Sequence, residues 1–450
     1  MQSLTSSASK LPCLLNINTR YAVHLENWRY WKRVLTRGFT QYYMRRACLQ
    51  QVYRRPGLKA IKGLEKGPNI FYGVLTMSNG TRASSSGPAV KTKTPPEPRP
   101  SSSIILLSPT NQALLLHRVK TSTSFASAHV FPGGNLSDFH DGTIPPPGDP
   151  RRHEDSLAYR LGAIRETFEE SGILLAREGS KDGPLLNLPT AERDEARKAI
   201  YENDISFGKW LESVGGVADT DGLLPFTRWV TPHGPPKRFT TQMYLYMLPL
   251  ETSPDPVLSA AQSEALIPTA DGGAEITAAH FDDAATWLRR QDRGDVILFP
   301  PQYFLLHLLS RFLTGAPSPS PSSSSIKELD SSQTTEYYRA QREKLRVFLH
   351  TVPTSTHPRA TEHPTSQIPW ADKVISPVTL GLRHTDQRAI LALDKPGNEL
   401  KGSGRGGDWE RVVLVKFGKA GPSNVEVRGR EEVLAEEREA KSKEAASSKL

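Results

Sequence analysis

Cysteine is nearly absent from this 450-residue sequence. Cys13 and Cys48 are the only two, and both lie within the first 50 residues. The chain beyond Cys48 therefore has no thiol for a disulfide, for a Cys-ligated zinc site or for a cysteine nucleophile. This usage fits synthesis in a reducing compartment.

Long hydrophobic runs are also missing. No stretch reaches 18 consecutive apolar residues, so we expect no membrane-spanning helix. The most apolar segment, residues 303–313, is too short to cross a bilayer. We interpret it as a buried helix near the end of a domain.

Acidic residues are scarce at the start of the chain. Residues 1–76 hold 13 Lys and Arg against Glu26 and Glu65, whereas the remainder is nearly balanced at −2. The overall charge of +9 therefore describes this leader and gives no reason to expect nucleic-acid binding by the rest. An RNA-binding role for the leader lacks a recognised motif. Its composition fits a mitochondrial transit peptide, or a segment outside the fold with Met77 as the true start.

The strongest positive signal is a predicted helix over residues 157–173 with two distinct faces. At 100° per residue, its apolar stripe consists of Leu157, Leu161, Ile164 and Phe168. Its acidic stripe consists of Glu166, Glu169 and Glu170. Carboxylates spaced i, i+3 and i+4 repel one another, and a hard divalent cation would relieve that repulsion. We expect the helix to begin at Asp155 or Ser156 and to end at Gly172.

This helix resembles the second half of the Nudix hydrolase signature, Arg-Glu-U-x-Glu-Glu-x-Gly-U with U aliphatic. The matching residues are Arg165, Glu166, Glu169, Glu170, Gly172 and Ile173, with Thr167 at the first U. The Gly133-Gly134 turn, within Phe-Pro-Gly-Gly, resembles the turn that opens the signature.

Two departures from the signature stand out. His140 occupies the position of the first signature glutamate. Asp138 and Asp141 lie beside it in the sequence and could supply the missing carboxylate. The spacer from His140 to Arg165 is 24 residues instead of seven, and its Pro-rich start predicts a surface loop.

The chain further resembles the peroxisomal coenzyme A diphosphatase branch of the Nudix hydrolases, over about residues 103–314. The supporting stretches begin at Ala128, Arg228, Pro236, Asp271 and Leu298. The resemblance implies hydrolysis of CoA or acyl-CoA to 3′,5′-ADP and (acyl) 4′-phosphopantetheine. Two alternatives stay open: a Nudix diphosphatase for NADH or ADP-ribose, and an inactive Nudix module that binds a ligand.

The resemblance also implies roles for individual residues. Glu166, Glu169 and Glu170 would bind Mg²⁺ or Mn²⁺, and Arg165 would orient a carboxylate. Gly133 and Gly134 would let the backbone turn tightly beside the site. Lys237 and Arg238 would grip the 3′-phosphate of CoA, or would form an ordinary solvated basic pair. The identity of the general base stays open.

The expected fold class is α/β, a Nudix fold with a mixed sheet between helices, a helical insertion at 189–214 and a small β-rich C-terminal extension. We expect a hairpin over 103–119, strands over 226–230 and 240–250, and helices over 284–290 and 302–313. The predicted segments are a leader (1–76), a disordered linker (77–102), the Nudix domain (103–314), a Ser/Pro-rich linker (315–370), the extension (371–430) and a charged tail (431–450).

The tail ends in Ser448-Lys449-Leu450, which matches a peroxisomal address read by an import receptor. We therefore expect a peroxisomal location and that receptor as a partner, with the mitochondrion as the alternative.

Overall fold

The computed structural model describes residues 95–121, 126–250, 266–270, 275–316 and 331–447. The basic leader, the two cysteines and the tripeptide Ser448-Lys449-Leu450 lie outside the described residues. All described residues belong to the unit Val90–Leu450.

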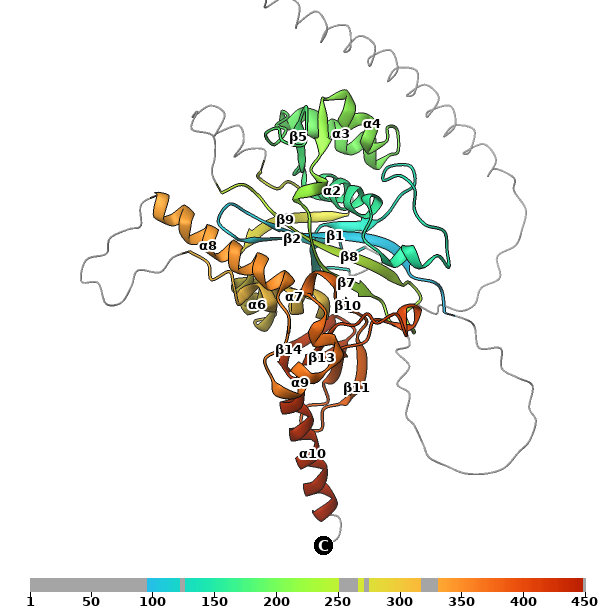
Figure 1. Ribbon diagram of the computed structural model, residues 1–450, viewed down its shortest axis with the longest axis vertical. Coiled ribbons are helices and arrows are strands. Elements are labelled where there is room, and N and C mark those ends of the chain that lie inside the picture. Colours follow the sequence, from blue (N-terminus) through green and yellow to red (C-terminus); the bar gives the residue numbers. More distant parts are fainter. Residues whose placement is uncertain (1–94, 122–125, 251–265, 271–274, 317–330, 448–450) are drawn as a thin grey trace, which may run out of the picture. The chain divides into compact units, whose positions relative to one another are not determined.

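A mixed eight-stranded sheet runs through the centre of the described chain (Figure 1). Its order is β10-β7-β8-β1-β2-β3, with β4 paired to β1 and β9 paired to β2. The strands are β1 (Arg99–Leu107), β2 (Ala113–Arg118), β3 (His129–Val130), β4 (Gly133–Asn135), β7 (Leu224–Val230), β8 (Phe239–Met247), β9 (Ile276–Asp282) and β10 (Val374–Ile375). Strand β1 is parallel to β8 and antiparallel to β4.

Helices cover both faces of this sheet because its central strands are apolar on both sides. Ile104 and Leu106 of β1 pack with one set of helices, and Ile105 and Leu107 pack with the other. The first layer contains α2 (Leu157–Ser171), α3 (Thr190–Tyr201) and α4 (Phe207–Ser213). The second contains α6 (Ala284–Asp292), α7 (Pro300–Ser310) and α8 (Ser331–His350). The short pair β5 (Ala176–Glu178) and β6 (Gly216–Ala218) joins the first layer.

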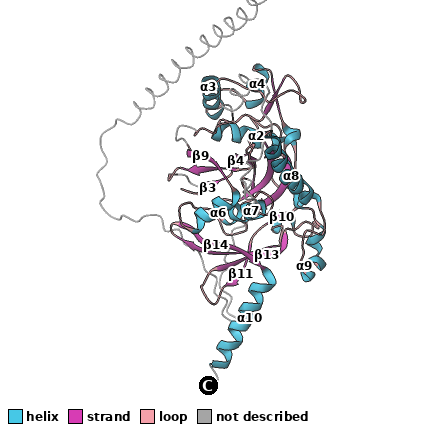
Figure 2. Cartoon of the chain, turned by 90° about the vertical axis from the view of Figure 1, so that its left-hand side faces the viewer, coloured by secondary structure: helices cyan, strands magenta, loops and turns pink. Residues whose placement is uncertain are grey.

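A second sheet lies beyond the α6–α7 layer (Figure 2). It has the order β11 (Val378–Leu382), β12 (Ala389–Leu393), β13 (Asp408–Gly418) and β14 (Gly421–Gly429). One face, with Leu391, Val413 and Val415, belongs to the same apolar core as α6 and α7. The other face is covered in part by α10 (Arg430–Ser447) through Val433. The expected α/β fold with a helical insertion and a β-rich extension is therefore confirmed.

Two expectations about the chain path were wrong, and a third was confirmed. Strand β1 begins at Arg99, so residues 99–102 belong to the sheet and not to the linker. The hairpin predicted over 103–119 is confirmed, since β1 and β2 pair antiparallel at Leu107 and Ala113. Its ladder is short because β4 pairs with β1 and β3 pairs with β2 beyond that point. Residues 351–370, expected to be linker, are structured, with α9 (Pro358–Glu362) and a 3-10 turn (Pro364–Gln367), and they end on the fully buried Trp370.

The prediction of the apolar stripe of α2 was also partly wrong. Ile164 and Phe168 are fully buried as expected, but Leu157 is 62% exposed in the first turn. The acidic face of α2 is not open to solvent, since Arg165 and Glu170 are buried. Helix α2 therefore lies against protein on two sides, and its carboxylates face an interior site.

Within the described residues, no helix has both the length and the apolar character needed to cross a bilayer.

Candidate active site

Helix α2 presents the acidic residues, and its C-terminal end is fixed. It starts after Ser156, and Gly172 ends it in the left-handed conformation at φ 73°, with its N–H on the Phe168 carbonyl at 2.9 Å. Thr269 donates its backbone N–H to the Ser171 carbonyl at 2.8 Å. The predicted helix end at Gly172 is confirmed.

Helix α3 of the insertion supplies two buried arginines that satisfy the last turn of α2. Arg197 donates from Nε and Nη2 to the Glu169 carbonyl, at 3.0 and 2.8 Å. Arg193 donates from Nη1 to the Gly172 carbonyl at 3.1 Å. The terminal carbonyls of a helix lack intrahelical donors, so two cations there are favourable. The insertion thereby holds the helix turn that carries Glu169 and Glu170.

The Gly133-Gly134 turn lies directly against two of the glutamates. The backbone N–H of Gly133 donates to Oε2 of Glu170 at 2.9 Å. A Cβ added to Gly134 would come within 2.4 Å of the Glu166 carboxyl carbon. A Cβ added to Gly133, whose φ is +155°, would lie 2.3 Å from the Ser102 carbonyl oxygen. Both positions require glycine for the close approach of β4 to α2 and β1.

Arg165 is the centre of a buried ion network. Its Nε and Nη2 donate to the two carboxylate oxygens of Asp141, at 2.8 and 2.9 Å. Its Nη1 lies 2.8 Å from Glu169 Oε1 and 2.9 Å from Glu166 Oε1. Nη2 also donates to the Asn135 carbonyl at 3.0 Å. Such a forked, charge-assisted arrangement fixes both the arginine and its carboxylates.

Asp141 is the one of the two aspartates beside His140 that binds Arg165. It is 1% exposed, and it also accepts the Ser137 backbone N–H at 2.8 Å. The other aspartate, Asp138, is exposed and accepts only a loop N–H in the described contacts. His140 turns away from Arg165: its Nε2 lies 3.0 Å from Asn203 Oδ1, and its Nδ1 accepts the Phe207 N–H at 3.2 Å. His140 fastens the helical insertion to the turn that precedes Asp141.

Glu170 is buried and Glu166 is largely buried, with 16% of its side chain exposed, and both carboxyl groups have raised pKa values. Burial raises the pKa of Glu166 from 4.5 to about 7, against the lowering effect of Arg165. Burial and the neighbouring charge of Glu166 raise the pKa of Glu170 well above its usual value, against the Gly133 hydrogen bond and Arg118. Two desolvated carboxyls that repel each other would be stabilised by a cation between them.

Arg118, at the end of β2, is a site residue that the sequence analysis did not assign. Its Nη1 lies 3.6 Å from Glu170 Oε1, and its Nη2 donates to Glu275 Oε2 at 2.8 Å. A usable signal was present: Leu114 and Leu116 face the α2 layer, and strand alternation places Arg118 on the same face.

The donor set fits a divalent metal such as Mg²⁺ or Mn²⁺, which prefers carboxylate oxygens. Glu166 and Glu170 are the residues that would hold it, because burial raises the pKa of both carboxyl groups. Glu169 has one oxygen bound to Arg165. Among the described residues, no three His, Cys, Asp or Glu side chains are already grouped as metal ligands.

Lys237 and Arg238 are not brought to the carboxylates by any described contact. Arg238 is 2% exposed, donates to Glu399 Oε1 at 2.6 Å and caps the carbonyls of Pro96, Thr231 and Pro232. Its guanidinium stabilises the turn before β8, and none of these contacts is with the carboxylate site. Lys237 is exposed on the same turn.

Comparison with known proteins is consistent with this geometry. Residues 148–309 match the family model described as the NUDT19 Nudix domain. The chain is 31% identical over 246 residues to "Acyl-coenzyme A diphosphatase NUDT19" of Gallus gallus, which covers 45% of this chain and 61% of that protein. It is 32% identical over 158 residues to a Caenorhabditis elegans protein assigned to the nudix hydrolases, covering 35% and 47%. The chain thus spans about half to three fifths of the length of these relatives.

Among solved structures, the fold is similar to a NUDIX hydrolase from Alicyclobacillus acidocaldarius. The match has 23% identity and a TM-score of 0.38, and it covers 52% of this chain and 99% of that one. The family match and the 31% identity make residues 148–309 similar to the Nudix domain of NUDT19.

Proposed function

We propose that the protein hydrolyses the diphosphate bond of CoA or acyl-CoA, giving 3′,5′-ADP and (acyl) 4′-phosphopantetheine, with Mg²⁺ or Mn²⁺. The observation that carries the proposal is the pair of largely buried, mutually repelling carboxyls, Glu166 and Glu170, against the Gly133-Gly134 turn. The name of the Gallus gallus relative supports the substrate class.

The bound metal would neutralise the charge of the diphosphate and lower the pKa of an attacking water. The chain supplies the rest. The Gly133 N–H and Arg118 hold the Glu170 carboxylate, while Arg165 holds Glu169 and Glu166. Arg165 is thus a positioning residue, because Asp141 and two glutamates occupy its donors.

Direct product analysis tests the proposal. The full chain is incubated with CoA, NADH and ADP-ribose in parallel, with Mg²⁺ or with EDTA, and products are resolved by mass. We expect 3′,5′-ADP from CoA, formed fastest of the three reactions and only with metal. Faster cleavage of NADH or ADP-ribose would refute the CoA assignment, and no cleavage of any of them would favour an inactive binding module.

Lys237 is the exposed candidate for contact with the 3′-phosphate of CoA. If it makes that contact, Lys237→Ala raises KM for CoA but not for dephospho-CoA, which lacks the group. Lys209→Ala, at an exposed lysine of α4, is the matched control. Equal effects on both substrates would remove Lys237 from the site.

We also propose peroxisomal import through Ser448-Lys449-Leu450. The supporting observation is that α10, which leads to this tripeptide, is exposed from Lys441 to Ser447. Removing Leu450 from a fluorescent fusion should release the fusion to the cytosol. Continued punctate import would exclude this signal.

A further inference from the structure

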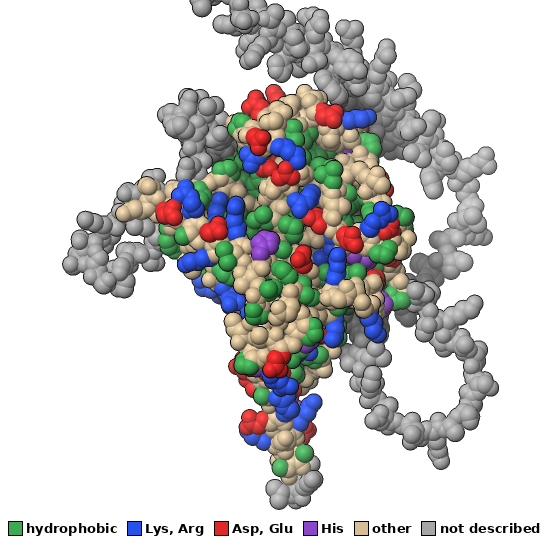
Figure 3. All heavy atoms as spheres, viewed as in Figure 1, with side chains coloured by type: hydrophobic (Ala, Val, Ile, Leu, Met, Phe, Trp, Pro, Cys, Tyr) green, Lys and Arg blue, Asp and Glu red, His purple; other side chains and the backbone are tan. Residues whose placement is uncertain are grey.

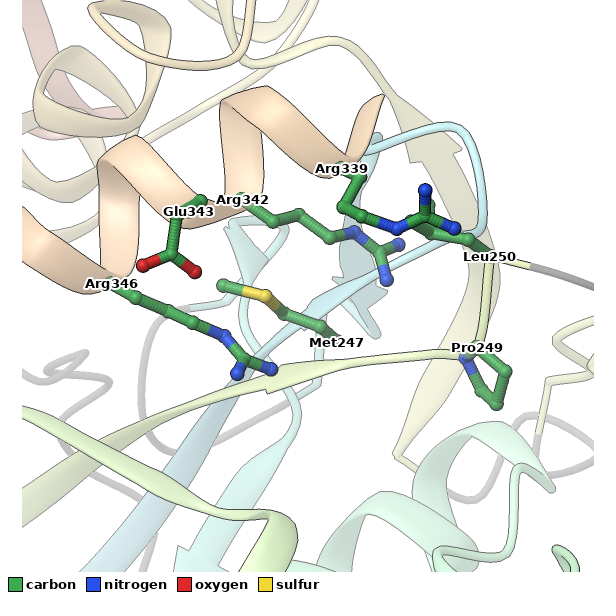
Figure 4. Close-up of a pocket in the computed structure, with 7 residues that line it drawn as sticks. All are labelled: Met247, Pro249, Leu250, Arg339, Arg342, Glu343 and Arg346. Atoms are coloured by element: carbon green, nitrogen blue, oxygen red, sulfur yellow. The ribbon is translucent and has the colours of Figure 1, made fainter. Parts of the chain in front are cut away.

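A cavity of about 500 Å³ lies between α8 and the end of β8, on a flank that the proposed hydrolysis does not use. One wall is apolar and consists of Met247, Pro249 and Leu250. The other wall is a row of arginines on one side of α8, Arg339, Arg342 and Arg346, with Glu343 between them (Figure 4). Figure 3 shows Lys and Arg side chains gathered along the flank where α8 lies.

Arg342 is a buried cation whose described hydrogen bonds all go to neutral oxygens. It donates from Nε to Asn111 Oδ1 at 2.6 Å, from Nη1 to the Leu248 carbonyl at 2.6 Å and from Nη2 to the Ser108 carbonyl at 2.7 Å. It is 7% exposed. A buried charge normally has an ionic partner, and none of these three acceptors is an anion.

The neighbouring charges do not supply that partner. Burial, and then the positive charge of Arg346, lowers the pKa of Arg342 to about 10. Arg346 is exposed, and the described contacts include no ion pair for it or for Glu343. Arg339 pairs with Glu336 at 2.6 Å, in an exposed pair that contributes little to stability and that an anion can replace. The cavity thus has positive charge in excess.

Helix α8 is held against the β1–β2 turn, and Arg342 is held in place before any ligand arrives. Asn111, in the β1–β2 turn, is 2% exposed and donates from Nδ2 to the Tyr338 carbonyl at 3.1 Å and to Gln341 Oε1 at 3.2 Å. Its φ of 61° places it in the left-handed region that asparagine tolerates. A fixed Arg342, with the exposed Arg346 beside it and an apolar wall opposite, is suited to a planar, phosphorylated ligand.

This cavity is separate from the carboxylate site. Gly134 pairs with Ser102 on β1, whereas Met247 pairs with Leu107. Five residues of strand separate the two ends by about 17 Å. The two sites also lie on opposite faces of the sheet, since α2 and α8 belong to different cores.

From these contacts we propose that the α8 cavity is a second ligand site, which binds a nucleoside phosphate. Its phosphate lies between Arg342 and Arg346, and its base lies on Met247 and Leu250. A volume of about 500 Å³ is in the range of small-molecule sites. The proposal does not depend on the identity of the diphosphate substrate.

Binding of AMP to the full chain in EDTA tests the proposal, because AMP has no diphosphate bond to hydrolyse and EDTA removes the metal from the carboxylates. Isothermal titration compares the wild type with Arg346→Glu and with Lys344→Glu. The second variant makes the same charge change at an exposed position outside the cavity. Inorganic phosphate and adenosine are titrated as separate probes.

We expect saturable AMP binding that Arg346→Glu weakens at least tenfold and that Lys344→Glu leaves within twofold. Phosphate alone should bind more weakly than AMP, and adenosine should not bind. Absence of AMP binding, or equal weakening by both variants, would overturn the site. Phosphate binding as tight as AMP binding would overturn the role of the apolar wall.

Discussion

Replacing Asp141 with Asn removes the ion pair with Arg165 without changing the shape of the site. Asn has nearly the same size but no charge, and it can accept only one of the two hydrogen bonds from Nε and Nη2 of Arg165. Breaking a buried pair by removing one partner costs about 3–5 kcal/mol. Arg165 keeps Glu166 and Glu169, so we expect the lower end of that range, about 3 kcal/mol.

The assay is urea unfolding of the full chain in EDTA, followed by turnover with Mg²⁺. Asp141→Asn should lower the free energy of unfolding by about 3 kcal/mol and reduce kcat at least tenfold, because the freed guanidinium binds the glutamates more tightly. Asp138→Asn, the matched control at the exposed neighbour, should change neither quantity appreciably. Equal effects of the two variants, or a loss below about 0.5 kcal/mol for Asp141→Asn, would refute the assignment of Asp141 as the partner of Arg165.

Three further predictions concern the neighbouring contacts. Gly134→Ala should reduce turnover at least tenfold with a small loss of stability, because the added Cβ displaces the Glu166 carboxylate. Gly208→Ala, with open space around the added Cβ, is the control. Kinetics measure the turnover and thermal melting measures the stability of each variant. Arg197→Ala should lower the free energy of unfolding by about 2 kcal/mol, because the Glu169 carbonyl loses two donors. Lys198→Ala, on the exposed side of α3, should lower it little in the same urea titration. The pKa of Glu166 is raised from 4.5 to about 7, so the metal-free folded state binds more protons than the unfolded state between these values, and its stability falls as the pH rises from 4.5 to 7. Glu166→Gln should flatten that fall, and an unchanged slope of stability against pH would exclude a largely buried Glu166.

The sequence predicted α2 and its end well because local chemistry determines both. The spacing of the glutamates and a glycine at 172 identify a helix and its left-handed cap without reference to the rest of the chain. From the sequence, Asp138 and Asp141 are both candidates for the missing carboxylate. The 24-residue spacer gives no indication of which of them lies beside Arg165 in the fold.

Other features depend on partners that are distant in sequence. Strand β1 pairs with β8, about 140 residues later. The hairpin at Pro109–Gln112 forms as the local signal indicates, but β4 and β3, which pair with β1 and β2, keep its ladder short. Arg238 binds Glu399, and the sequence does not reveal this distant pairing. The Pro- and Ser-containing segment around 351–370 has the composition of a linker, yet the burial of Trp370 orders it against α7 and α8. Composition reports average tendencies, whereas one large buried side chain can determine a local path.

The central claim is that Glu166 and Glu170 hold the divalent metal on which hydrolysis depends. Electron paramagnetic resonance of Mn²⁺ titrated into the full chain measures this directly, without substrate. We expect one saturable Mn²⁺ site in the wild type and in Glu195→Gln, an exposed change on α3, and its loss in the Glu166→Gln/Glu170→Gln double variant. Unchanged Mn²⁺ affinity in a double variant that remains folded would contradict the account.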